Sequence, residues 1–111
     1  SYTSRTLEAG VIESLGYRVV QAADGMDGLR ALRNEKVDLI LCDIEMPRLD
    51  GFGMLSEVKK QERLRDIPFI LISSIEDPAI VQKGLSLGAD SYIVKRYFEQ
   101  EELRSTIRHY L

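Results

Sequence analysis

The chain has 111 residues, 44% of them apolar and 30% charged, which is an ordinary composition for one globular domain. Its formal net charge of −3 argues against nucleic-acid binding, and no apolar run approaches the roughly 20 residues that cross a bilayer. The single cysteine, Cys42, excludes an internal disulfide and suits a reducing, cytoplasmic location.

In chain order, apolar residues at helical spacing first predict a helix that carries Leu7 and Leu15 and ends at Gly16. Four units follow, each made of a short apolar run and a helix. The apolar runs lie at residues 17–20, 37–42, 69–72 and 92–94. The four helices lie at residues 26–32 after an Asp24 cap, at 52–61, at 78–88 with Pro78 in the first turn, and at 101–111.

The apolar runs do not alternate with polar residues, which is typical of strands that are covered on both faces. Alternating strands and helices predict a parallel sheet with right-handed crossovers, an α/β fold. The order begins with a helix, however, whereas a doubly wound sheet normally begins with a strand.

Polar residues stand where three of the predicted strands end. Asp43 ends the second run, Ser73 and Ser74 end the third, and Lys95 follows the fourth. In a parallel sheet these ends meet at the edge where ligands bind. A carboxylate can attack phosphorus and form an acyl phosphate, while a lysine and a hydroxyl stabilise the phosphoryl oxygens.

The loop after Asp43 has its own pattern. Pro47 forces the preceding residue into an extended conformation, and Asp50 with Gly51 makes a turn into the next helix. Asp43 and the backbone carbonyl of Glu45 offer two of the oxygen ligands that Mg²⁺ prefers.

Each of these residues alone also has an ordinary structural interpretation. Asp43 is then a capping acid, Lys95 a surface charge, and Ser73 and Ser74 strand-end residues. Tyr92, at the start of the fourth run, is likewise an ordinary core residue. The joint position of Asp43, the two serines and Lys95 at successive strand ends favours the functional interpretation.

Four segments carry a resemblance to a known family: "ESLGYRVVQAADGMDGL", "LILCDIEMPRLDG", "IPFILISS" and "LGADSYIVK". With them, residues 1–111 resemble the receiver domain of two-component response regulators. The ending "VKRYFEQEEL" is similar to receivers fused to chemotaxis-type histidine kinases.

The resemblance implies a flavodoxin-like sheet of strand order 2-1-3-4-5 and a cytoplasmic phosphorelay role. Asp43 would accept a phosphoryl group, with Mg²⁺, from a phosphohistidine on a kinase or phosphotransfer domain. Ser73, the backbone of Ser74 and Lys95 would contact that group, and Ser73 and Tyr92 would act as the switch. The face formed by the fourth helix, the last strand and the last helix would then signal to an output domain or protein. Such a domain assists its own phosphorylation and dephosphorylation and is not a turnover enzyme.

The sequence departs from the family in two ways. Arg96 takes the place of the usual proline after Lys95, which weakens the case for a cis peptide there, because a cis bond without proline costs about 3 kcal/mol. The family's first strand and its acidic pair are also missing, so we expect a domain truncated at its N-terminus that binds Mg²⁺ weakly.

Without its central strand the sheet would have a gap of about 10 Å between the runs at 17–20 and 37–42. Three solutions are considered, in this order: the natural protein supplies the strand, a second copy donates one in a swapped homodimer, or the flanking runs close up and pair.

Two rival functions are considered. One is a degenerate receiver that serves as a phosphorylation-independent docking module. The other is an aspartyl-nucleophile phosphatase, although the residues after Asp43 do not match the D-x-D pattern of those enzymes.

Overall fold

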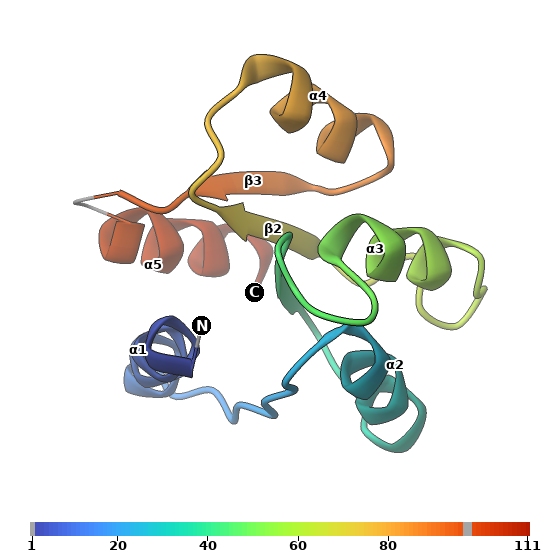
Figure 1. Ribbon diagram of the computed structural model, residues 1–111. Coiled ribbons are helices and arrows are strands. Elements are labelled where there is room, and N and C mark those ends of the chain that lie inside the picture. Colours follow the sequence, from blue (N-terminus) through green and yellow to red (C-terminus); the bar gives the residue numbers. More distant parts are fainter. Residues whose placement is uncertain (1, 97–98) are drawn as a thin grey trace.

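The computed structural model describes the backbone of residues 2–96 and 99–111, and side chains from residue 7 onwards outside 97–99. The described part contains five helices and three strands (Figure 1). In chain order they are α1 (Tyr2–Ser14), α2 (Gly25–Asn34), β1 (Ile40–Asp43), α3 (Gly51–Lys59), β2 (Phe69–Ser73), α4 (Pro78–Ser86), β3 (Ser91–Val94) and α5 (Glu99–Tyr110).

The helix starts follow local chemistry. The side chains of Asp24, Asp50 and Asp77 accept hydrogen bonds from the first-turn N–H groups of α2, α3 and α4. The predicted Asp24 cap is therefore confirmed, and Pro78 occupies the first turn of α4 as expected.

The three strands are parallel in the order β1-β2-β3, with Cys42 opposite Leu71 and Leu71 opposite Tyr92. Because β2 is central, all five of its residues are buried. The α/β class with a parallel sheet is confirmed.

Two apolar cores cover opposite faces of the sheet. On one face α1 and α5 lie together, and Val11, Leu103 and Ile107 pack against β2 and β3. On the other face α2, α3 and α4 lie over the sheet, and Leu32, Leu55 and Val58 belong to the core there (Figure 1).

The prediction of a strand at residues 17–20 is wrong. The described sheet has three strands, and residues 17–22 run from α1 to α2 without pairing. A cavity of about 330 Å³ separates this segment from β1, with Val19, Val20, Leu39 and Leu41 in its lining. An extended segment needs a neighbour about 4.8 Å away to form a ladder, and here none is in place.

The same cavity overturns the third solution considered above. The segment at 17–22 and the strand β1 have not closed up to pair with each other.

None of the helices in the described part is both long and apolar enough to span a membrane. No peptide bond between described residues is cis, so the bond between Lys95 and Arg96 is trans.

Candidate functional site

Asp43 and Lys95 form an ion pair at the carboxyl edge of the sheet. The Lys95 Nζ lies 2.6 Å from Asp43 Oδ1, and each side chain is about one-fifth exposed. Asp43 ends β1 and Lys95 directly follows β3, so the two residues come from opposite sides of β2. Asp43 Oδ1 is buried and has no hydrogen-bond partner among the described residues, and the Lys95 ammonium is the charge that faces it.

Ser73 lies between them at the end of β2. It is buried, and its carbonyl accepts a hydrogen bond of 2.8 Å from the Lys95 N–H. Its hydroxyl accepts from the Ile75 N–H at 3.1 Å and donates to Glu45 Oε1 at 3.4 Å. Ser74, the next residue, is exposed.

Tyr92 contacts the loop that follows Ser73. Its hydroxyl donates a hydrogen bond of 2.8 Å to the Ile75 carbonyl, while its partly buried ring packs against the core under α4. In the same loop, Glu76 forms an ion pair of 2.7 Å with Arg96, which follows β3. The loop after β2 is therefore bonded to Tyr92 of β3 through Ile75 and to Arg96 through Glu76.

The sequence analysis did not single out Glu8, which lies beside this site. Glu8 is a buried acid of α1, and its Oε1 lies 4.0 Å from Lys95 Nζ. A signal was available, because Glu8 precedes Val11 and Ile12 by three and four residues and so falls on the apolar side of the helix.

A backbone hydrogen bond joins the two ends of the loop between Asp43 and α3. The Gly51 N–H donates to the Ile44 carbonyl at 2.8 Å, and a Cβ at Gly51 would collide with the Asp43 carbonyl oxygen. At the far end of the loop, the Leu49 N–H donates to the Pro47 carbonyl at 2.7 Å around Arg48, whose φ is +64°. Such a backbone costs about 1–3 kcal/mol for a residue other than glycine.

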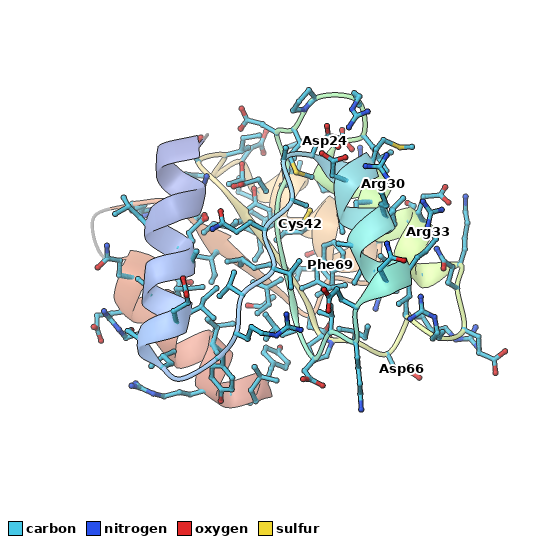
Figure 2. All side chains as sticks on the ribbon, turned by 90° about the horizontal axis from the view of Figure 1, so that it is seen from below. Asp24, Arg30, Arg33, Cys42, Asp66 and Phe69 are labelled. Atoms are coloured by element: carbon cyan, nitrogen blue, oxygen red, sulfur yellow. The ribbon has the colours of Figure 1, made fainter. Side chains whose placement is uncertain are left out.

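Arg48 reaches from this loop to the start of α2. Its Nε lies 2.8 Å from Oδ2 of the buried Asp24, and its Nη2 lies 3.2 Å from Oδ1 of Asp27. The hydrogen bond from Arg48, together with the Asp27 N–H, holds the pKa of Asp24 below its ordinary value. In turn, the hydrogen bond to the Asp24 carboxylate and its charge, together with the Asp27 carboxylate, raise the pKa of Arg48. Figure 2 shows Asp24 at the N-terminal end of α2, above Arg30.

The described residues alone do not fit a magnesium site. They contain no group of three or more acidic, histidine or cysteine side chains that could hold a metal ion. Asp43 is already paired with Lys95, and the Glu45 carboxylate is turned to Ser73. The sequence prediction that Asp43 and the Glu45 carbonyl are ligands therefore remains a prediction.

A family model described as the response regulator receiver domain matches residues 2–108. The chain belongs to the response regulator receiver domains. The chain is 41% identical over 100 residues to a probable transcriptional regulator, ycf27, of Cyanophora paradoxa, a match that covers 90% of this chain and 40% of that protein. It spans less than half the length of the curated relatives it matches.

Solved receiver domains have the same fold. The receiver of a signal transduction histidine kinase from Syntrophus aciditrophicus superposes with a TM-score of 0.90 at 32% identity, covering 100% of this chain and 83% of that one. The receiver of a Pseudomonas aeruginosa sensor histidine kinase gives 0.88 at 28% identity, covering 99% and 89%, and has magnesium in its active-site cleft. The flavodoxin-like receiver fold and its place in two-component signalling are thus confirmed for this chain.

Proposed function

We propose that this receiver domain accepts a phosphoryl group on Asp43. The observation that carries the proposal is the 2.6 Å pair between Asp43 Oδ1 and Lys95 Nζ at the edge where the three strands end. A carboxylate can attack phosphorus as a nucleophile, and an ammonium group held next to it stabilises the added phosphoryl charge.

In this step an oxygen of Asp43 attacks the phosphorus of a phosphohistidine on a kinase or phosphotransfer domain. The new oxygen–phosphorus bond forms as the nitrogen–phosphorus bond breaks, and the imidazole leaves with the bonding pair. Lys95 offsets the phosphoryl charge. The Ser73 hydroxyl turns from Glu45 to a phosphoryl oxygen, and the N–H of Ser74 donates to another.

The test is phosphate uptake from a small donor such as radiolabelled acetyl phosphate. We expect acid-stable, alkali-labile label on the wild-type domain, none on Asp43→Asn, and label reduced by about tenfold or more on Lys95→Met. The control is Lys60→Met, since Lys60 is a surface lysine that pairs only with Glu57 among the described ion pairs. Label that persists on Asp43→Asn would contradict the proposal.

Magnesium binding belongs to the proposal in a weak form. Receiver relatives hold the ion, but the residues described here supply one carboxylate of the site, so we expect the 111-residue chain to bind Mg²⁺ only in the millimolar range. Isothermal titration measures this, and submicromolar binding that depends on Asp43 would refute it.

The switch is proposed to run through Ser73 and Tyr92. When the Ser73 hydroxyl moves to the phosphoryl group, the adjoining Ile75 moves with it and the bond from Tyr92 to Ile75 must rearrange. The face formed by α4, β3 and α5 then changes its affinity for an output domain or protein. Equal binding of that partner by both phosphorylation states would contradict the switch.

A second candidate is a receiver that docks a partner without phosphorylation. It is favoured by the Glu45 carboxylate, which already occupies the Ser73 hydroxyl, and by the lack of a metal-binding group among the described side chains. Partner binding that is unchanged in Asp43→Asn distinguishes it from the first. The proposal includes a cytoplasmic location and a homodimer formed by strand swapping.

A further inference from the structure

A second set of charged contacts lies at the far end of the loop that leaves Asp43, on α2. The Arg48 guanidinium bonds Asp24 at 2.8 Å and Asp27 at 3.2 Å. Alongside, the Gly25 N–H donates to the Leu49 carbonyl at 3.2 Å, and a Cβ at Gly25 would collide with that oxygen. We call the contacts of Arg48 with Asp24 and Asp27 the clamp.

Asp24 is well suited to hold the clamp. It is buried, and its two oxygens have separate partners: Oδ1 accepts from the Asp27 N–H and caps α2, while Oδ2 accepts from Arg48. The carboxylate is therefore fixed by the helix before Arg48 reaches it. A pre-oriented acceptor costs little conformational entropy when the guanidinium binds.

The clamped loop reaches the phosphoacceptor site at three points. Ile44 directly follows Asp43, and its N–H donates to the Ile72 carbonyl at 3.2 Å. The Gly51 N–H returns the loop to the Ile44 carbonyl, and Glu45 within the loop accepts from Ser73. These contacts connect the loop that carries Arg48 to both Asp43 and Ser73.

The strained backbone at Arg48 supports the same conclusion. A residue with φ of +64° persists only where its surroundings hold it. The contacts around this one are the clamp, the short turn from Pro47 to Leu49 and the hydrogen bond from the Gly25 N–H to the Leu49 carbonyl. The clamp is the only one of these contacts that the Arg48 side chain makes, so its loss weakens the hold on the strained backbone.

We infer that Arg48 and Asp24 are positioning residues for phosphoryl transfer, because their clamp to α2 fixes the loop that orients Asp43 and Ser73. The inference rests on the proposed role of Asp43. A displacement of about 1 Å at a reacting group is enough to slow a reaction strongly, so a contact this far from Asp43 can matter to the rate.

The experiment measures the rate constant for phosphorylation of the intact protein by acetyl phosphate in saturating magnesium chloride. Arg48→Met removes the guanidinium but keeps an unbranched side chain of about the length of the arginine stem and the same backbone demand. Asp24→Asn loses the charge but keeps an oxygen that caps α2. Arg48→Lys restores a positive charge with a single donor site.

The chain offers a matched control in Arg30. It pairs with the same Asp27 Oδ1 at 2.8 Å and is as exposed as Arg48, but it lies on α2 and does not bond the loop. Arg30→Met therefore removes an equal surface charge and an Asp27 partner without releasing the clamp.

We expect Arg48→Met and Asp24→Asn each to lower the rate constant about tenfold, and the double variant to be no slower than either single one. Arg48→Lys should recover part of the rate, and Arg30→Met should stay within about twofold of wild type. Hydrogen exchange should rise at residues 45–50 in both clamp variants and stay unchanged in β2, which separates a displaced loop from a loosened fold.

Three results would overturn the inference: a wild-type rate in Arg48→Met, an equal loss in Arg30→Met, or additive losses in the double variant. A wild-type protein that takes up no phosphate would instead overturn the proposed function, and the clamp inference with it. The two failures are thus distinguished by the wild-type measurement.

Discussion

Asp24 shows how one carboxylate serves two neighbouring elements. It caps α2 and also receives the Arg48 guanidinium from the loop before α3. Because its surroundings favour the charged form, its pKa in the folded protein is lower than the ordinary value of 3.8. The folded state therefore binds this proton less readily than the unfolded state does.

This difference predicts an acid limb in the stability curve. Asp24 contributes its full stabilisation above pH 3.8, the ordinary value, and loses it as the pH falls through the lower pKa of the folded protein. Asp24→Asn should therefore be less stable than wild type near neutral pH, and the gap should shrink as the pH falls below 3.8. Urea unfolding across a pH series measures this, with Asp38→Asn, an exposed acid in none of the described ion pairs, as the control. A gap that stays constant would contradict the role assigned to Asp24.

Residues that form ion pairs with partners far away in the sequence were also the hardest to find from the sequence. The positions of Asp43, Ser73 and Lys95 at strand ends followed from runs of apolar residues, which can be counted. Arg48 and Asp24 are 24 residues apart in the chain, and Arg96 and Glu76 are 20 apart. No regular spacing marks such partners, because the fold of the loops decides which charged residues meet. Charged residues are usually exposed, so a charged residue in the sequence says little about which partner it will meet.

At the scale of elements, α4 depends on a glycine for its packing. Gly84 would be an unfavourable residue inside a helix by propensity alone. In the structure it is buried against β2, and a Cβ there would lie 2.6 Å from Leu71 Cδ1. The glycine therefore permits α4 to approach the sheet closely, near Tyr92.

Gly84→Ala should accordingly destabilise the domain by about 1–3 kcal/mol, because the overpacking outweighs the gain in helix propensity. Gly10→Ala is the matched control: Gly10 lies in α1, and a Cβ added there would meet no atom within 4 Å, so alanine should stabilise by up to about 1 kcal/mol. Thermal or denaturant unfolding compares the two. An equally stabilising alanine at residue 84 would show that α4 is held less closely than described.

Helices were predicted well from the sequence because they carry local signals. These are periodic apolar residues, an aspartate cap at α2, α3 and α4, and a proline in the first turn of α4. The segment at 17–20 carries the composition of a strand, but a strand also needs a partner in space. Composition cannot report whether that partner is in place, and here it is not. The error was therefore one of tertiary context.

At the scale of the whole molecule, the described sheet has a central strand, β2, that is covered on both sides, and an edge strand, β1, that has a neighbouring strand on one side only. β2 is buried along its length between β1 and β3, whereas β1 faces the cavity of about 330 Å³ on its other side. Across that cavity, the backbone N–H groups of residues 17–22 make no hydrogen bond to another backbone group of the described chain.

Hydrogen exchange should reflect this asymmetry. In the 111-residue chain we expect amides 17–22 to exchange fast and those of β2 to exchange slowest, at the rate of global unfolding. A version of the protein with an added apolar strand that fills the cavity should protect residues 17–22 and stabilise the domain. Strong protection of 17–22 without any added strand would mean that this segment is paired in solution.

The sulfur of Cys42 offers a way to follow these motions without a foreign label. It is only 4% exposed, lies 3.7 Å from the Met54 sulfur, and its burial raises the pKa of the thiol. Because the chain has no second cysteine, a reagent such as iodoacetamide can attack one place only, and only after the molecule opens. The rate of Cys42 alkylation, followed by mass spectrometry, would then report how often the wild-type protein opens.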